Sequence, residues 1–383
     1  MKTAVIIAEY DPFHYGHKYL IDQTRAAGAT HIAAVMSGSF TQRGGAAVFD
    51  KFTRAKTALE NGVDLVIELP ARYSLTSAAG FARGAVGIAN ALGCVDMLSF
   101  GSESGDIDAL KEASGAIDYT IHSDEFEIYI RKGLSYPAAL QKALLKFYTD
   151  DVAELISSPN NTLAIEYLNA LDSFGSAIQP FTTERYGAAH DSDEDGEFIS
   201  GSAIRKMIAA GKDYSKYAPV TDAPTADIAR LERAILAALR NLRPCDLDCI
   251  ADCSGGLGDR LYKAIRKGNS LSGIYFMAKT KRYTLARIRR ALLCAFLGID
   301  KDISREKPAY IRVLGMNTRG KEILSAAQCS LPIDTSLKAL SQTSAEARRQ
   351  AEFEARITDL YSLAFTEPMP CGVDFTSKPV IIE

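Results

Sequence analysis

The sequence predicts an α/β protein with a doubly wound parallel sheet, followed by a mainly α-helical C-terminal domain. Over the first hundred residues, short Val- and Ile-rich runs alternate with stretches of helical spacing. Strands that alternate with helices in this way form parallel sheets with right-handed crossovers. From residue 226 onward the apolar spacing is mainly that of amphipathic helices. The 383 residues, of which 47% are hydrophobic, can fill two or three cores.

The expected elements follow in chain order. Strands are predicted at residues 3–8, 31–36, 63–69 and 95–100, and helices at residues 18–27, 50–61 and 74–92. Residues 106–174 are predicted to be mostly helical, residues 177–186 extended and residues 199–210 helical. We therefore expect a first domain of residues 1–211, a linker of residues 212–225 and a mainly helical, basic domain of residues 226–383.

The charge is distributed unevenly along the chain. The formal net charge is −3, yet residues 260–321 carry 16 Lys and Arg against Asp300, Asp302 and Glu306, a local charge of +13. The remainder must therefore total −16. Such an asymmetry suggests that the C-terminal part meets a polyanion.

The sequence predicts a soluble cytoplasmic protein. Its first eight residues are too short for a signal-peptide hydrophobic region, and the apolar block of residues 291–297 is far shorter than a membrane span. Seven scattered cysteines fit reduced thiols better than a disulfide framework. We expect no contact with a membrane, and the sequence implies no protein partner.

His14 and His17 form the motif that carries the chemistry. They lie three residues apart directly after the first predicted strand, although the chain has only five histidines. Ligands of open parallel sheets bind at the carboxyl ends of the strands. We expect Gly16 to let a phosphate approach the backbone of the helix that begins near His17. Two imidazoles at this position can donate hydrogen bonds to phosphoryl oxygens, which predicts a phosphate site.

Other roles compete for the two histidines. One histidine at this position is most often a capping or packing residue, and two at this spacing could bind a metal. However, no third Cys, His or paired carboxylate follows at ligand spacing, and a glycine between the histidines has no role in coordination. The sequence therefore predicts no protein-built metal site.

The segment FISGSAIRKMI, residues 198–208, supports the phosphate interpretation. Ser200 and Ser202 stand at the entrance of a predicted helix, where hydroxyl groups cap the helix and can bind phosphate oxygens. Arg205 and Lys206 follow and can neutralise charge. Taken alone, this would be an ordinary serine cap with exposed basic residues. Beside the histidine pair, it resembles the other wall of a nucleoside triphosphate pocket.

The H-x-G-H and S-x-S-x-I-R segments resemble the two signatures of the nucleotidyltransferase superfamily related to class I aminoacyl-tRNA synthetases, which implies a Rossmann-like fold. Longer stretches resemble one family, the tRNA(Met) cytidine acetate ligases, most specifically in residues 1–105, 158–210 and 280–297. These stretches are EYDPFHYGH, MSGSFTQRGGAAVFDKFTRAKTALENGVDLVIELP, FGSESGD, SPNNTLAIEYL, RYGAAHD and KRYTLARIRRALL.

The resemblance implies an activity. Members of this family activate acetate with ATP as acetyl-adenylate, release pyrophosphate and pass the acetyl group to the wobble cytidine of elongator tRNA(Met), forming N4-acetylcytidine. ATP and acetate would thus be substrates and the tRNA the partner. We expect Mg²⁺ to bridge the phosphates, although the sequence assigns no ligand to it.

The resemblance also implies site residues. His14 and His17 would be catalytic, and Gly101 would approach the nucleotide where a side chain would clash. Either Asn160 or Asn161 would contact ATP. The full ATP-binding set would be Ile7, Ala8, Glu9, Tyr10, Asp11, Pro12, Phe13, His14, Tyr15, Gly16, His17, Lys18, Tyr19, Leu20, Gly101, Asn160, Asn161, Arg185, Tyr186, Ser200, Ser202 and Arg205.

One element departs from the expected pattern. Gly201 stands where a small residue with a Cβ is expected, so we expect a looser helix entrance and a weaker grip of this segment on phosphate.

Two further groups are expected. Some of Ser37, Ser39, Gln42 and Arg43, which follow the second strand, would line an acetate or cytosine pocket, although a glycine-rich loop shaped only by turns is an equally good interpretation. In the helix near residues 281–297, basic residues would track an RNA backbone while a tyrosine stacks on a base; a solvated basic face is the alternative. These residues are Lys281, Arg282, Tyr283, Arg287, Arg289 and Arg290.

Two alternative functions remain open from the sequence. A small-molecule adenylyltransferase of the same superfamily would share the histidine pair but leave the basic C-terminal part unexplained. An RNA-binding protein with a degenerate nucleotide site would lack ATP turnover, against which the intact His14, Gly16 and His17 argue.

Overall fold

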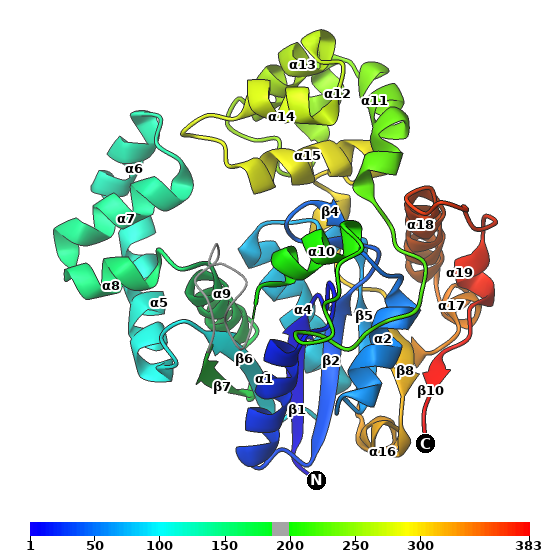
Figure 1. Ribbon diagram of the computed structural model, residues 1–383. Coiled ribbons are helices and arrows are strands. Elements are labelled where there is room, and N and C mark those ends of the chain that lie inside the picture. The colour runs from blue at the N-terminus through cyan, green and yellow to red at the C-terminus, as the bar shows by residue number, and fades with distance from the viewer. Residues whose placement is uncertain (186–198) are drawn as a thin grey trace.

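The computed structural model describes residues 1–185 and 199–383, and its centre is an eight-stranded sheet. The strand order is β10-β8-β5-β2-β1-β6-β7, with β9 paired to β8 (Figure 1). The strands are β1 (Thr3–Ala8), β2 (His31–Ser37), β5 (Leu65–Leu69), β6 (Met97–Ser102), β7 (Gln179–Glu184), β8 (Ile311–Met316), β9 (Ile333–Asp334) and β10 (Val380–Ile381). A separate hairpin pairs β3 (Phe40–Thr41) with β4 (Gly45–Ala46).

Helices cover both faces of the sheet, as the alternating sequence pattern predicts. The run from β5 through β2, β1 and β6 to β7 is parallel throughout. Val5 and Ile7 of β1 pack into the core on one face, and Ala4 and Ile6 into the core on the other. The first face is covered by α4 (Ala78–Leu92), α5 (Ile107–Ile121), α9 (Pro159–Ser173) and α16 (Thr318–Ala326), and the second by α1 (Tyr15–Ala26) and α2 (Lys51–Glu60). The predicted doubly wound α/β sheet is therefore confirmed.

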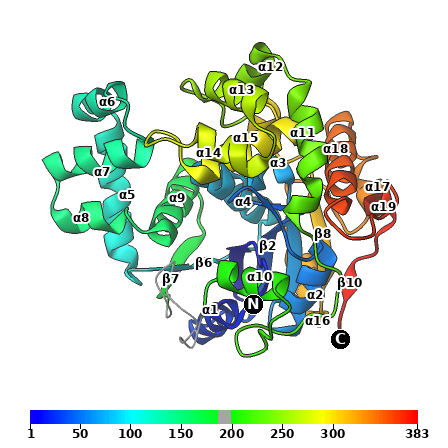
Figure 2. The ribbon, with the colours of Figure 1, turned by 45° about the horizontal axis from the view of Figure 1, so that its top comes forward.

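The remaining helices lie around this sheet. In Figures 1 and 2 the helices α5 to α8 (residues 107–155) form an arm beside it, and α11 to α15 (residues 232–297) lie over the carboxyl ends of the strands. The helices not yet given are α3 (Ala71–Ser74), α6 (Asp124–Arg131), α7 (Tyr136–Phe147), α8 (Asp150–Leu155), α10 (Gly201–Ala209), α11 (Glu232–Arg240), α12 (Pro244–Cys249), α13 (Leu257–Lys267), α14 (Leu271–Ala278), α15 (Leu285–Leu297), α17 (Leu337–Leu340), α18 (Ala345–Ser362) and α19 (Val373–Thr376). Within residues 1–185 and 199–383, we find no helix with the length and apolar character that crossing a membrane requires.

The C-terminal part differs from the sequence prediction. The sequence predicts that residues 226–383 form a separate, mainly helical domain. In the structure, however, β8 of this part pairs antiparallel with β5 of the central sheet, and β10 pairs with β8. The completely buried β8 covers what would otherwise be an open sheet edge. Residues 212–225 were expected to be a linker, yet Tyr217 and Ala218 are buried and the backbone N–H of Tyr15 donates to the Tyr217 carbonyl at 2.9 Å.

A buried cluster of four charges fastens the C-terminal segment to the sheet. Lys51 Nζ of α2 lies 2.7 Å from Glu68 Oε1 of β5 and 2.8 Å from Asp374 Oδ2 of α19. Arg312 Nη1 of β8 lies 3.0 Å from Glu68 Oε2 and 2.8 Å from Asp374 Oδ1. All four side chains are at most 4% exposed, so each charge depends on its partners to offset its lost hydration.

This cluster yields a stability prediction. The substitution Arg312→Met would leave Glu68 and Asp374 with Lys51 as the one remaining cation of the cluster. Removing one partner of a buried pair costs about 3–5 kcal/mol, so we expect the free energy of unfolding to fall by that amount. Urea denaturation of the variant against the parent protein measures it.

The control is Lys56→Met on α2, the helix that also carries Lys51 of the cluster. Lys56 is 61% exposed and lies 3.7 Å from Glu60, so its loss should cost less than about 1 kcal/mol. Equal effects of the two substitutions would contradict the interdependence of the four buried charges.

Candidate active site

His14 and His17 lie side by side where β1 leads into α1. His14 is the N-cap residue of α1, and its backbone N–H donates to His17 Nδ1 at 3.1 Å. The two imidazoles stack with their centroids 3.7 Å apart and their planes 22° apart. The rings of Tyr10 and Phe13 pack against His17 at centroid distances of 4.9 and 5.5 Å. The loop therefore fixes both imidazoles at the carboxyl end of β1.

Burial keeps both histidines neutral. The pKa of His14 is lowered to about 3, mainly by burial and then by the charges of Arg185 and Arg205. The pKa of His17 lies well below its ordinary value because of burial, His14 and Arg185. A neutral imidazole carries one N–H, and because His17 Nδ1 accepts from His14, its proton is on Nε2. Each ring can therefore donate one hydrogen bond without placing a buried charge in the site.

Three arginines from separate parts of the chain converge near this pair. Arg43 lies in the turn between β3 and β4, Arg185 follows β7 and Arg205 lies on α10. Burial lowers the pKa of Arg43, with Glu9 opposing and Arg205 reinforcing the shift. Burial also lowers the pKa of Arg185, with Glu103 opposing and Arg43 reinforcing. The arginines repel one another, so a bound polyanion would stabilise their charged forms. This agrees with the phosphate site that the sequence predicts at this edge of the sheet.

Arg205 ties the second predicted motif to the first. Its Nη1 donates to the Asp11 backbone carbonyl and lies 3.2 Å from Asp11 Oδ2. Ser200 caps α10 by accepting from the Ala203 N–H at 3.3 Å, and its hydroxyl lies 2.9 Å from that of Ser202. Asp11 Oδ1 in turn accepts from the Val48 N–H at 2.7 Å. The two signature segments, far apart in the sequence, therefore meet at one place.

The glycines of the site accommodate other parts of the protein. A Cβ on Gly16 would lie 3.0 Å from His14 Nδ1 and Cε1, and one on Gly101 would lie 2.9 Å from Arg185 Cγ. A side chain added at Gly16 or Gly101 would therefore clash with His14 or Arg185, whether or not a nucleotide is bound. A Cβ on Gly201 would lie 3.2 Å from the Asp11 carbonyl, so this glycine lets α10 approach the loop. The Ser200 cap is present at this helix entrance, and the expected loosening and weaker grip on phosphate stay predictions.

The two asparagines have different surroundings. Asn161 is buried, and its Oδ1 accepts from the N–H groups of Glu103 and Ser104 at 2.8 and 3.1 Å. Asn160 Nδ2 donates to Glu103 Oε1 at 2.7 Å, and its Oδ1 accepts from Arg185 Nη1 at 3.2 Å. Asn161 therefore holds the loop after β6, and Asn160 lies beside an arginine of the site. Glu103 was missed, although it stands within the motif FGSESGD.

The other predicted ATP-binding residues differ in position. Ile7 and Ala8 are buried in β1, where their side chains belong to the core. Lys18 forms an ion pair with Asp22 on the surface of α1. Tyr186 lies outside the described residues.

The loop after β2 contacts the loop after β1. Gln42 donates through its backbone N–H to Glu9 Oε1 at 2.6 Å and through Nε2 to the Thr76 carbonyl at 3.3 Å. Ser37 and Ser39 are buried. The Gln42 contact places this residue of the predicted acetate or cytosine set beside the histidine loop.

Arg54 connects both loops and was not predicted. It is 1% exposed, and it donates to the carbonyl oxygens of Glu9 at 2.6 Å, Ser37 at 3.0 Å and Phe49 at 3.0 Å, and also to that of Gly38. An arginine on an amphipathic helix is ordinarily exposed, so the sequence offered no signal for this role.

Three of the residues predicted to bind RNA make contacts within the protein instead. Tyr283 is 7% exposed and its hydroxyl donates to the Gly255 carbonyl at 2.5 Å, so the prediction that its ring stacks on a base is wrong. Arg290 is buried and lies 2.6 Å from Asp252, and Arg287 donates to the carbonyls of Asp252 and Ser254. Both were expected to track RNA, but they hold α15 against the loop between α12 and α13.

The other predicted RNA-binding residues reach the surface. Lys281 and Arg282 are exposed, whereas Arg289 is partly buried and lies over the Tyr275 ring.

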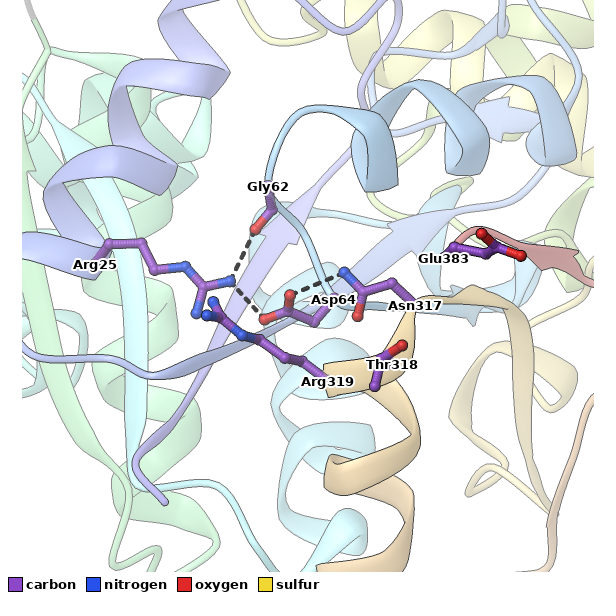
Figure 3. A pocket seen from close by; sticks show the side chains of 7 residues that line it. All are labelled: Arg25, Gly62, Asp64, Asn317, Thr318, Arg319 and Glu383. Atoms are coloured by element: carbon purple, nitrogen blue, oxygen red, sulfur yellow. Dashed lines mark hydrogen bonds and ion pairs between the residues drawn. The ribbon is translucent and has the colours of Figure 1, made fainter.

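A cavity of about 390 Å³ lies at the opposite, amino end of the sheet (Figure 3). Arg25 Nη2 donates to the Gly62 carbonyl at 3.1 Å and to Asp64 Oδ2 at 2.5 Å. Asn317 Nδ2 donates to Asp64 Oδ1 at 3.0 Å. These groups satisfy one another, and the cavity lies far from the histidine pair in the fold.

Comparison with known proteins agrees with this geometry. The model of a family described as HIGH Nucleotidyl Transferase matches residues 1–371. The tRNA(Met) cytidine acetate ligase of Thermoanaerobacter sp. (strain X514) is 37% identical over 97% of each chain. That of Clostridium perfringens (strain ATCC 13124) is 35% identical over the full length of both. The chain belongs to the tRNA(Met) cytidine acetate ligase family. The crystal structure of Thermotoga maritima TmcAL bound with alpha-thio ATP covers all of both chains with a TM-score of 0.88 and 30% identity.

The close approach of Gly16 to His14 yields a prediction. In Gly16→Ala the His14 ring must shift by a few tenths of an ångström, because the new Cβ would lie 3.0 Å from its Nδ1 and Cε1. We expect acetate-dependent ATP–pyrophosphate exchange to fall about tenfold or more, since small misplacements of catalytic groups are costly. The control is Gly115→Ala on α5, where a Cβ would meet nothing within 4 Å and exchange should be unchanged. Equal rates in both variants would contradict the proposed constraint.

The neutral histidines predict a pH dependence of stability. Below about pH 6.5 the unfolded chain takes up protons on His14 and His17 that the folded protein resists, so the free energy of unfolding falls as the pH falls toward 3. The double variant His14→Gln/His17→Gln lacks these groups and should show a shallower fall. Urea denaturation from pH 7 to pH 4 measures both slopes, and identical slopes would refute the buried, neutral state.

Proposed function

We propose that the protein is an ATP-dependent ligase that acetylates N4 of the wobble cytidine of elongator tRNA(Met). It would first join acetate to AMP with release of pyrophosphate. The observation that carries the proposal is the stacked, neutral histidine pair beside Arg43, Arg185 and Arg205 at the carboxyl end of β1. The names of the relatives and the alpha-thio ATP bound in the Thermotoga structure support the same substrates.

The first step needs positioning and electrostatic stabilisation. An acetate oxygen forms a bond to the α-phosphorus of ATP while the bond from that phosphorus to the bridging oxygen breaks and pyrophosphate leaves. Negative charge grows on the phosphoryl oxygens, where the N–H groups of His14 and His17 can donate. Arg185 and Arg205 add positive charge without covalent chemistry. Because the imidazoles are neutral, the positive charges of the arginines do not repel them.

The second step transfers the acetyl group. The cytidine N4 attacks the acetyl carbonyl carbon, the bond to the AMP oxygen breaks, and N4 loses one proton. The loop after β2, with Ser37, Ser39, Gln42 and Arg43, is our candidate for the acetate or cytosine pocket because Gln42 contacts Glu9 of the histidine loop. Lys281 and Arg282, exposed on the helical part over the same sheet edge, are our candidates for tRNA contacts.

We also infer that Mg²⁺ accompanies ATP, bound chiefly to its phosphate oxygens, as is usual for this ion. Among residues 1–185 and 199–383, no group of three or more His, Cys, Asp or Glu could hold a metal ion. The cation would supply further neutralisation of phosphate charge. We expect the protein to act in the cytoplasm, where its tRNA substrate is found.

The test separates the two halves of the reaction. We expect His17→Ala to lower acetate-dependent ATP–pyrophosphate exchange by at least about a hundredfold, because one donor to the developing charge is lost. Binding of elongator tRNA(Met), measured by filter retention, should change less than about twofold, because His17 lies in the nucleotide site. His122→Ala is the matched control, because His122 is 73% exposed at the end of α5.

Each result has a distinct meaning. Equal loss of exchange and of tRNA binding in His17→Ala would contradict the division of roles. Pyrophosphate exchange by the parent protein that needs no acetate would favour a small-molecule adenylyltransferase instead.

A further inference from the structure

The Phe276 side chain on α14 is almost fully exposed and does not contribute to the packing of its helix. Its exposed fraction is 86%, the highest among the large hydrophobic side chains of the described residues. Its helix is already anchored, since Leu271, Ile274 and Ala278 are buried. Burying a phenylalanine side chain is favourable, and the fold forgoes that gain here. A single exposed apolar residue is common, so its surroundings must decide whether it has a role.

The chain segment that carries Phe276 is strongly basic. Residues 260–299 contain ten Lys and Arg and no Asp or Glu. Lys279, Lys281 and Arg282, which follow α14 directly, are all exposed. An exposed aromatic ring beside exposed positive charges fits a nucleic-acid strand, whose bases stack on the ring while its phosphates meet the cations.

This surface is coupled to the candidate active site through α15. Arg289 lies over the Tyr275 ring at 5.5 Å, which joins α15 to α14 next to Phe276. Arg290 Nη1 donates to the Gln42 carbonyl at 3.1 Å. Gly44 packs so closely that a Cβ would lie 2.7 Å from the Arg290 backbone nitrogen. In Figures 1 and 2 the α14–α15 connection projects toward the α5–α8 arm, on the side of the strand ends.

We propose that Phe276 stacks on an unpaired base of the tRNA, with Lys281 and Arg282 binding neighbouring phosphates. The inference rests on the proposed function and assigns the stacking role that the buried Tyr283 cannot fill. An RNA strand is favoured over a second copy of the chain or an apolar protein partner because residues 260–299 contain no acidic residue and the exposed Lys279, Lys281 and Arg282 follow the helix that carries the ring.

The test compares Phe276→Ala, Phe276→Leu and Phe276→Tyr. Stacking of a base on an aromatic side chain contributes to affinity, so Phe276→Ala and Phe276→Leu should weaken binding of elongator tRNA(Met) and raise its KM about tenfold. Phe276→Tyr keeps an aromatic ring and should bind as the parent protein does. Ile381→Ala, which removes a 52% exposed apolar side chain on β10, is the control. Thermal melting checks that the exposed substitutions leave the fold intact.

Two outcomes would overturn the inference alone. The first is acetylation by Phe276→Ala with the parent KM, and the second is a fall in apparent mass of Phe276→Ala by light scattering, which would make Phe276 a contact between copies. A parent protein that exchanges pyrophosphate with acetate but neither binds nor acetylates the tRNA would instead refute the proposed function together with the inference.

Discussion

The sheet edge that carries the candidate active site depends on one buried guanidinium. Arg54 reaches from α2 to backbone carbonyls of Glu9 after β1 and of Ser37 and Gly38 at the end of β2. Loops at sheet ends are ordinarily the most variable part of an α/β fold. Here a single side chain satisfies carbonyl groups of both loops, and without it they would lose this buried donor. The position of the histidine pair and of Gln42 follows from that shared attachment.

The site is also shaped by burial of ionisable groups. Burial disfavours charge on His14 and His17 and lowers the pKa of Arg43 and Arg185. A nucleotide bound at this site would supply the missing negative charge through its phosphates, and the neutral imidazoles would supply donors without adding to the repulsion. The free site is thus preorganised for charge that arrives with the substrate, which is the arrangement expected for electrostatic stabilisation of phosphoryl transfer.

Much of the fold and part of the site could be predicted from the sequence. The strand–helix alternation and the H-x-G-H spacing predict the sheet and the histidine pair, because both are local patterns. Three features could not be obtained this way. The insertion of β8 beside β5 depends on tertiary pairing, the role of Arg54 depends on burial of a residue type that is usually exposed, and the burial of Tyr283 depends on a contact with Gly255. The periodicity of apolar residues does not reveal these contacts, because they join residues that are far apart in the sequence.

The decisive experiment is nucleoside mass spectrometry of elongator tRNA(Met) incubated with the protein, ATP and carbon-13-labelled acetate. We predict labelled N4-acetylcytidine at the wobble position, formed in amounts that match the pyrophosphate released. Pyrophosphate release without any labelled nucleoside in the tRNA would contradict the proposed ligase activity.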